Sequence, residues 1–146
     1  MMKEIYQPLA ASAKNKETAI KRLADIIAIL RVACPWDRVQ THDSLRAGML
    51  EEAYEVVEAI NHQDLDNLRE ELGDVLLQVV FHARIEEEQD VFAFDDVVDG
   101  ICKKLIFRHP HIFGNVEVAS SEEVLRNWDD LKRKEKHPIY GKFVNK

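Results

Sequence analysis

Glycine and proline, the residues that most often interrupt helices, are scarce in this sequence and stand far apart. The 146 residues include five glycines and four prolines, and neither type occurs between Met49 and Leu72. Apolar residues recur at the three- and four-residue spacing of amphipathic helices, and no segment alternates apolar and polar residues as a half-buried strand does. The sequence therefore predicts an all-α fold.

The prolines and the cap residues divide this pattern into an antiparallel helical bundle of about five helices. The expected helices cover residues 16–31, 44–61, a third segment that ends near 88, residues 95–107, and a last segment near the C-terminus. Asp64 or Asp66 is a good N-cap for the third helix. The run Ser120-Ser121-Glu122-Glu123 has the form of a capping box and should start the fifth. Residues 109–119 are expected to form one long irregular loop.

The length fits one domain with a core that needs no crosslinks. A chain of this size buries about 68–70% of its unfolded surface, and 46% of its residues are hydrophobic. We expect an N-terminal arm over residues 1–15, one domain over 16–136 and a tail over 137–146. Only Cys34 and Cys102 are present, so a disulfide framework is excluded and Cys34 is expected to be structural.

Charge and hydropathy narrow the class of protein further. The chain has 20 basic and 27 acidic residues, a net charge of −7, which argues against a binder of DNA or RNA polymers. The N-terminus lacks the apolar stretch of a signal peptide. The longest apolar run, near Val75–Phe81, is interrupted by Gln78. We therefore expect a cytoplasmic protein with no membrane segment.

The acidic excess belongs to one segment. Residues 51–74 contain nine carboxylates and one base, Arg69, a local charge of −8, whereas residues 103–146 carry ten Lys or Arg against six Asp or Glu. The nine carboxylates are Glu51, Glu52, Glu55, Glu58, Asp64, Asp66, Glu70, Glu71 and Asp74. One strongly negative region therefore precedes a basic one.

Two apolar stripes place four of these acids at equivalent positions on two helices. On the second helix the stripe consists of Met49, Ala53, Val56, Val57 and Ile60, and on the third of Leu68, Leu72, Val75, Leu76, Val79 and Ala83. Both stripes are expected to face a core. Glu52 and Glu55 flank the first stripe, and Glu71 and Asp74 flank the second, so an antiparallel pair of helices would bring the four together.

Four carboxylates along one helix seam would repel one another unless a cation lay between them. Oxygen ligands without His or Cys suit Mg²⁺ or Mn²⁺ better than zinc. Gly73, in the middle of the third helix, could let the facing helix or a ligand approach closely. Glu51, Glu58 and Glu70 project toward solvent, where acidic residues commonly have no ligand.

These residues carry a resemblance to a known family. The pattern Glu51-Glu52-x-x-Glu55 followed by Glu71-x-x-Asp74 resembles the signature of the all-α nucleoside triphosphate pyrophosphohydrolases. Three further motifs make the chain similar to the MazG family over residues 20–136: Cys34-Pro35-Trp36-Asp37-x-x-Gln40-Thr41, Glu70-Glu71-Leu72-Gly73-Asp74 and Arg108-His109-Pro110-His111-Ile112-Phe113-Gly114. Some members carry two such domains, and this sequence holds one copy.

The resemblance implies an activity. Family members hydrolyse nucleoside triphosphates, ribo- or deoxyribo-, between the α and β phosphates to a monophosphate and pyrophosphate, with Mg²⁺, and so clean the nucleotide pool. It implies a helical homo-oligomer with a dimer as its unit. It also implies Glu52, Glu55, Glu71 and Asp74 as metal ligands, and Lys104, Arg108, Trp128 and Lys132 as substrate-binding residues.

Other residues have roles that the pattern leaves open. A carboxylate not fully engaged with metal, Glu51 or Glu55, could act as the general base. Trp36 could stack on a nucleobase or cover the core. Gln78 and His82 continue the line of Glu71 and Asp74 along the third helix and are expected to line a pocket or a polar seam. His109 and His111 could contact phosphate or shape their loop.

Several alternatives were weighed against this interpretation. There is no Gly-x-x-x-x-Gly-Lys loop, which excludes a P-loop site. Glu70-Glu71-Leu72-Gly73 resembles part of a Nudix box, but the upstream glycine spacing and the β pattern are missing. A ferritin-like di-iron site requires Glu-x-x-His, and position 74 is Asp. A non-catalytic helical dimerisation module with a degenerate metal site stays open as the alternative.

Overall fold

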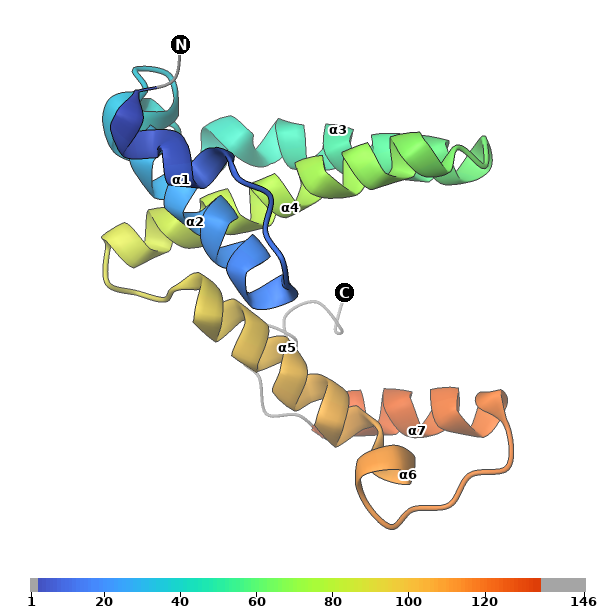
Figure 1. Cartoon of the computed structure of the whole chain (residues 1–146). Helices are drawn as coiled ribbons and strands as arrows, with labels where there is room; N and C mark the ends of the chain where they lie inside the picture. Colours follow the sequence, from blue (N-terminus) through green and yellow to red (C-terminus); the bar gives the residue numbers. More distant parts are fainter. Residues whose placement is uncertain (1–2, 135–146) are drawn as a thin grey trace. The chain divides into compact units, whose positions relative to one another are not determined.

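A computed structural model describes residues 3–134, and every regular element in that range is helical (Figure 1). The all-α prediction is confirmed. The α-helices are α1 (Gln7–Ala10), α2 (Lys16–Ala33), α3 (His42–Asn61), α4 (Leu65–Glu88), α5 (Phe94–Arg108), α6 (Pro110–Phe113) and α7 (Ser121–Lys134). Two 3₁₀ helices, η1 (Glu4–Tyr6) and η2 (Asp37–Val39), complete the set.

The expected count of about five helices is wrong, because the described residues form seven. The two additional helices, α1 and α6, are four residues long and have Pro8 and Pro110 in their first turns. Proline suits that position because its fixed φ is helical and no N–H is needed there. Thus α6 lies inside the segment expected to be an irregular loop. Four long helices, α2 to α5, begin and end within two residues of their predicted bounds, and α7 begins at the predicted Ser121.

Side-chain caps explain where the long helices begin. Thr41 and Ser44 form a reciprocal capping box at the start of α3, and Asp64 accepts a hydrogen bond from the backbone N–H of Asn67 at 3.1 Å at the start of α4. Ser120 accepts from the backbone N–H of Glu123 at 3.3 Å, which confirms the cap predicted for α7. Each cap satisfies a backbone donor that has no partner within the helix.

The described residues form two compact units that divide between Phe94 and Asp95. In the first unit α3 and α4 run antiparallel, side by side, as a helical hairpin, and α2 packs on α4 (Figure 1). The core consists of Ile27, Leu45, Val80 and Phe81, from all three helices. The core therefore lies at the end of the hairpin where α3 begins and α4 ends.

The rest of the hairpin departs from expectation, because the predicted apolar stripes are only partly covered. Ala83 is buried, but Val57 is 50% exposed, Ile60 57% and Leu72 52%. The physical reason is the position of α2, which packs against the C-terminal part of α4 and leaves the distal half of the hairpin without a third helix from the first unit. We call this uncovered surface the distal apolar face: Val57, Ile60, Leu72 and Leu76, all at least 39% exposed.

Arg31 ties the elements at the core end together. Its guanidinium donates to a carboxylate oxygen of Glu88 at 2.8 Å, to the carbonyl oxygen of Asp37 at 2.7 Å and to that of Gln40 at 2.9 Å. The hydrogen bond with Arg31 lowers the pKa of the Glu88 carboxyl. One partly buried guanidinium thus joins α2, α4 and the loop that carries Trp36.

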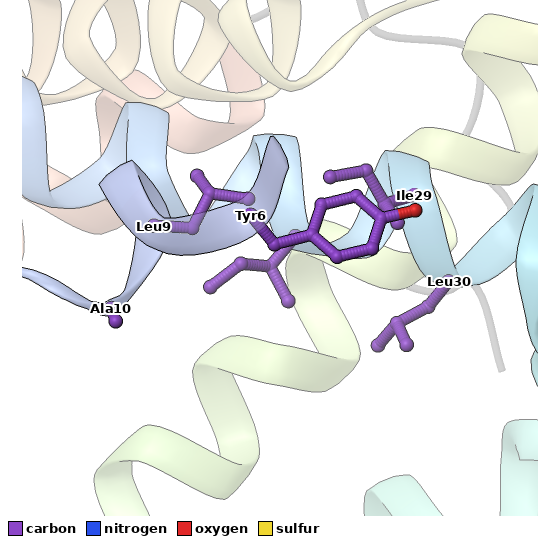
Figure 2. Close-up of a pocket in the computed structure, with 6 residues that line it drawn as sticks. Tyr6, Leu9, Ala10, Ile29 and Leu30 are labelled. Carbon is purple, nitrogen blue, oxygen red and sulfur yellow. The ribbon is translucent and has the colours of Figure 1, made fainter. Parts of the chain in front are cut away.

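The N-terminal segment packs on α2. The Arg22 guanidinium donates to the carbonyl oxygen of Leu9 at 2.6 Å. Behind this contact is an apolar pocket of ≈ 200 Å³ lined by Tyr6, Leu9, Ala10, Ile26, Ile29 and Leu30 (Figure 2). The segment expected as an arm is therefore part of the first unit as far as residue 15. Within residues 3–134 no helix combines the length and the apolar character needed to cross a membrane. The expected tail, residues 137–146, and the last two residues of the expected domain lie outside the described range.

Candidate metal centre

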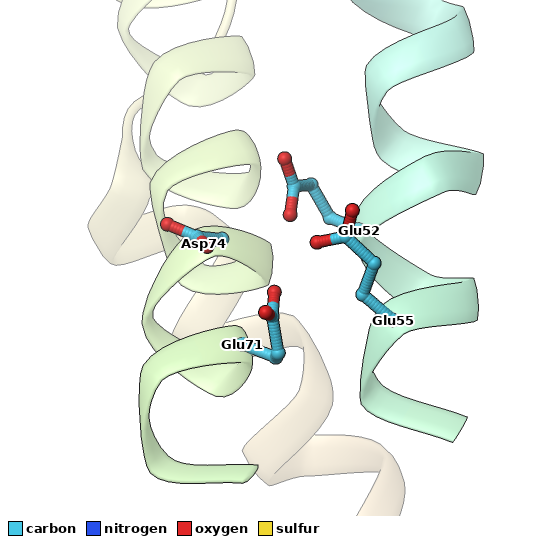
Figure 3. A group of neighbouring side chains, drawn as sticks. All are labelled: Glu52, Glu55, Glu71 and Asp74. Carbon is cyan, nitrogen blue, oxygen red and sulfur yellow. The ribbon is translucent and has the colours of Figure 1, made fainter. Parts of the chain in front are cut away.

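The helical hairpin brings four carboxylates together from two helices. Glu52 and Glu55 come from α3, and Glu71 and Asp74 come from α4 (Figure 3). One carboxylate oxygen from each residue lies within 4.8 Å of those of the other three. The antiparallel pairing expected from the two motifs is thus present, and the cluster is large enough to surround a single cation.

A tight turn between α3 and α4 sets the register of these residues. The backbone N–H of Asp64 donates to the carbonyl oxygen of Ala59 at 3.1 Å, and Gln63 adopts a left-handed conformation with φ 54°. Ala59 is 2% exposed, and its small side chain lets the two helices approach closely. The turn therefore determines which acid on α3 faces which acid on α4.

Crowding among the four carboxylates raises the pKa of two of them, Glu52 and Glu71. A hydrogen bond with Glu55, burial and the neighbouring charges raise the pKa of Glu71 to about 7. Burial, followed by the charges of Asp74 and Glu55, raises the pKa of Glu52. Like charges disfavour ionisation of their neighbours, so Glu71 retains a proton more readily than an isolated carboxylate as long as no cation is bound.

The cluster has no cationic side chain to balance it. Within residues 3–134, no Lys, Arg or His forms an ion pair with any of the four acids. The one base in the acidic segment, Arg69, pairs with Asp66 at 3.5 Å on the surface. One carboxylate oxygen of Glu52 and one of Glu71 are buried without a hydrogen-bond partner.

A divalent metal ion would supply the positive charge that the described residues do not bring to this cluster. It would supply positive charge to the unpaired oxygens, and an all-carboxylate ligand set matches the preference of Mg²⁺ and Mn²⁺ for oxygen. Which metal the residues hold stays a prediction.

Glycine permits a close approach near the cluster, but at a different position from the one expected. A Cβ placed on Gly73 would meet nothing within 4 Å, so the expectation that Gly73 admits the facing helix is wrong. A Cβ on Gly48 would lie 3.1 Å from Nε2 of Gln78. Gly48 on α3 therefore leaves room for the Gln78 side chain of α4, one helical turn from Asp74.

His82, expected from the sequence to line a pocket or a polar seam, lies in a polar cluster further along the same seam, and sequence reasoning missed its partners His42 and Glu86. Nδ1 of His42 is 2.7 Å from Nδ1 of His82, the rings are stacked, and Nε2 of His42 is 2.6 Å from a carboxylate oxygen of Glu86. Burial, followed by the charge of His42, lowers the pKa of His82. The register of α3 and α4 could have revealed this cluster from the sequence, because the pairing that sets Glu52 beside Asp74 also places His42 beside His82.

The second unit brings two of the predicted substrate-binding residues together. The Arg108 side chain is buried at 6% exposure, and its guanidinium carbon lies 5.5 Å from the centre of the Trp128 ring. His109 contacts Trp128 edge-on, with ring centres 4.8 Å apart, and its Nδ1 donates to the carbonyl oxygen of Leu105 at 2.6 Å. Arg108 is therefore held in a fixed orientation against an aromatic ring.

The remaining predicted site residues are Lys104, Lys132, Glu51 and Trp36. Lys104 is one turn before Arg108 on α5, and Lys132 is exposed one turn after Trp128 on α7. Glu51 is exposed outside the group of four acids. Trp36 is 61% exposed on the loop before α3, so it does not cover the core.

Comparison with known proteins identifies relatives in several bacteria. The family described as the MazG nucleotide pyrophosphohydrolase domain matches residues 40–113. The nucleoside triphosphate pyrophosphohydrolase/pyrophosphatase MazG of Thermotoga maritima is 46% identical over 125 residues, which cover 83% of this chain and 48% of that protein. The nucleoside triphosphate pyrophosphohydrolase of Escherichia coli K12 is 44% identical over 120 residues, covering 80% and 46%. The uncharacterized protein YabN of Bacillus subtilis is 53% identical over 104 residues, covering 71% and 21%.

The fold agrees with these sequence matches. The crystal structure of a mazG-related protein from Thermotoga maritima matches 77% of this chain and 98% of its own, with a TM-score of 0.65 and 28% identity. The chain spans about half the length of two of the curated relatives and about a fifth of the third. The matched segment covers half of the chain and contains all four carboxylates, and the chain belongs to the MazG nucleotide pyrophosphohydrolase domain family.

Proposed function

We propose that this protein hydrolyses nucleoside triphosphates between the α and β phosphates, giving a monophosphate and pyrophosphate, with Mg²⁺ as cofactor. The observation that carries the proposal is a group of four carboxylates, inside a MazG domain, that form no ion pair with any base among residues 3–134. The relatives in Thermotoga maritima and Escherichia coli are named for this type of activity. Its biological role would be to remove unwanted nucleotides from the cytoplasmic pool.

Glu52, Glu55, Glu71 and Asp74 would hold the metal ion. When bound, Mg²⁺ would polarise the phosphoryl oxygens and lower the pKa of a nearby water. The four side chains would fix the position at which the triphosphate meets this charge. Glu71, whose pKa is raised, must lose its proton to bind the metal ion. Mn²⁺ has the same ligand preference and would substitute.

A carboxylate would accept the proton of the attacking water. Glu55 is one candidate, because it already shares a hydrogen bond with Glu71 within the cluster. Glu51 is the other, because it lies beside the metal ligands without belonging to the group of four. A base placed next to the water would raise its nucleophilicity as the α phosphorus is attacked.

Basic and aromatic side chains would bind the rest of the substrate. A nucleoside triphosphate carries about four negative charges, which Lys104, Arg108 and Lys132 would neutralise. Packing on Trp128 supports a role for Arg108, because a guanidinium held in one orientation loses little entropy when it contacts phosphate. Trp128 and Trp36 would offer ring faces to the base.

We further propose that a second copy of the chain packs on the distal apolar face. Four large apolar side chains of the hairpin, two on α3 and two on α4, are exposed, and a contiguous apolar patch on a surface is commonly an interaction site. A homodimer would cover them and would give each metal centre a drier environment. This arrangement agrees with the homo-oligomer implied by the family resemblance.

Product analysis in ¹⁸O-labelled water tests the proposed reaction. A panel of ribo- and deoxyribonucleoside triphosphates should yield monophosphate and pyrophosphate, with the label in the monophosphate because water attacks the α phosphorus. Glu71→Gln should abolish turnover, while Glu70→Gln, at the exposed neighbouring position, should not. Label in the pyrophosphate, release of orthophosphate, or no turnover of any nucleotide would contradict the proposal and favour a non-catalytic module.

A further inference from the structure

Gln78 extends the line of metal-binding candidates along α4. It follows Asp74 by four residues and Glu71 by seven, so all three side chains lie on one face of the helix. Side chains one turn apart have Cβ atoms about 5–6 Å from each other, so the Gln78 side chain starts within one turn of Asp74 in the carboxylate cluster.

The facing helix is shaped to receive this side chain. A Cβ on Gly48 would lie 3.1 Å from Nε2 and 3.8 Å from Cδ of Gln78. The carboxamide therefore packs close to the backbone of α3, at a position where a larger side chain would push it aside by a few tenths of an ångström. Its location in the seam is set by both helices and does not depend on a neighbouring polar side chain.

The oxygen of this carboxamide has no donor. Oε1 of Gln78 is buried, and it accepts no hydrogen bond from residues 3–134. One oxygen of Glu52 and one of Glu71 are also buried without a hydrogen-bond partner among the described residues. A carboxylate can compensate for the missing hydrogen bond by binding a proton or a metal ion. An amide oxygen binds protons too weakly for that, so it needs a hydrogen-bond donor, and an unpaired buried acceptor is destabilising.

A hydrated cation would bring such donors to the seam. Mg²⁺ and Mn²⁺ usually keep several water ligands, and residues around a metal commonly orient its ligands through hydrogen bonds. We propose that Gln78 is a positioning residue whose Oε1 accepts a hydrogen bond from a water bound to the metal ion in the four-carboxylate cluster. The inference rests on the proposed metal site and adds a residue that would orient water within it.

Binding of Mn²⁺ alone, measured by calorimetry and by electron paramagnetic resonance, tests this without any nucleotide. Gln78→Leu should weaken Mn²⁺ binding about tenfold, as is typical when a residue that orients metal ligands is lost. Gln78→Glu retains an acceptor oxygen and should bind Mn²⁺ at least as well as the wild type. Gln89→Leu, at the exposed end of α4, is the matched control and should leave the affinity unchanged.

Thermal unfolding of the metal-free protein distinguishes positioning from packing. Gln78→Leu removes an unpaired buried oxygen and keeps a similar volume, so the metal-free variant should melt at the same or a higher temperature than the wild type. Weaker Mn²⁺ binding together with undiminished stability supports the proposal. A lower melting temperature together with wild-type Mn²⁺ affinity would show that Gln78 only packs, and would overturn it.

Gly48→Ala supplies an independent test through the facing helix. Its methyl group should displace the carboxamide and weaken Mn²⁺ binding in the wild-type background, but add nothing in Gln78→Leu, because the group it displaces is already absent. Equal losses in both backgrounds would mean that the methyl group acts elsewhere and would count against the proposal.

Nucleotide kinetics distinguish water from substrate as the donor. Orientation of a metal-bound water predicts that Gln78→Leu lowers kcat by a similar factor for every nucleotide with little change in KM. An increase in KM for some nucleotides only, with Mn²⁺ affinity intact, would show that Gln78 contacts the nucleoside and would overturn the proposal. A wild-type protein that binds Mn²⁺ but hydrolyses nothing would refute the proposed function, while the Mn²⁺ comparison would still decide the role of Gln78.

Discussion

Glu71 shares a hydrogen bond with Glu55 inside the group of four carboxylates, and its pKa rises to about 7. A metal ion must displace that proton to use the carboxylate as a ligand. We therefore expect the Mn²⁺ affinity of the wild type to increase as the pH rises from about 6 to about 8. Calorimetric titrations at several pH values measure this, and a constant affinity over the range would contradict the shared proton.

The same residue sets the sign of a stability change in the metal-free protein. Because folding raises the pKa of Glu71 from 4.5 to about 7, its contribution is fully present below pH 4.5 and is lost as the pH rises through about 7. The side chain in Glu71→Gln stays neutral at every pH. The melting temperature of this variant minus that of the wild type should therefore increase as the pH rises across this interval. A gap that does not widen with pH would refute the assignment.

His82 changes the stability with pH in the opposite direction to Glu71. Comparing the wild type with Glu71→Gln removes this effect of His82. Its pKa is lowered from 6.5 by burial and by His42, so its contribution is present above pH 6.5 and is lost as the pH falls through the lower folded value. Wild type and Glu71→Gln both contain His82. The difference between their melting temperatures therefore reports on Glu71.

At the scale of elements, Arg31 decides how the loop before α3 is held. Arg31→Met removes the hydrogen bonds to Glu88, Asp37 and Gln40 and should lower the free energy of unfolding by roughly 2–4 kcal/mol. Urea unfolding followed by tryptophan fluorescence measures the loss. The control is Lys21→Met, which breaks an ion pair whose lysine is 73% exposed and should cost less than about 0.5 kcal/mol. Similar losses in both variants would refute the anchoring role.

The turn that joins α3 to α4 contains a strained residue. Gln63 has φ 54°, a conformation that favours glycine, so Gln63→Gly should stabilise the protein by about 0.5–1 kcal/mol in urea unfolding. Gln89 has φ −98°, and Gln89→Gly should be neutral or destabilising. Equal effects of the two substitutions would show that backbone strain at Gln63 is unimportant.

Local rules predicted most of the elements and the pairing of the acids. Caps at Asp64 and Ser120 could be predicted because each involves residues a few positions apart. The repeat of the acidic motif at a spacing of 19 residues was enough to predict that α3 and α4 bring Glu52 and Asp74 together.

Long-range packing could not be predicted in this way. The partial exposure of Val57 and Leu72 depends on where α2 packs, and the place of Gly48 depends on the Gln78 side chain of another helix. Both facts involve contacts between elements, on which hydrophobic periodicity carries no information. The short helices α1 and α6 were missed for another reason, since Pro8 and Pro110 were interpreted as helix breaks when they lie in first turns.

At the scale of the whole molecule, the distal apolar face predicts the oligomeric state. Sedimentation should give about twice the chain mass of 16.9 kDa for the wild type. Val57→Lys places a charge in this face and should shift the protein to monomers. Val32→Lys, at a position on α2 that is 73% exposed, should stay dimeric. A monomeric wild type, or a dimer that tolerates Val57→Lys, would refute the proposed interface.

The hairpin of α3 and α4 also has a consequence for the order of folding. Its turn spans only a few residues, so closing it costs little chain entropy. Contacts between residues so close in sequence form early in folding. The repelling carboxylates are therefore brought together before α2 completes the core at the other end. A divalent cation present while the chain folds would relieve that repulsion and would act on the folding rate as well as on the stability of the finished protein.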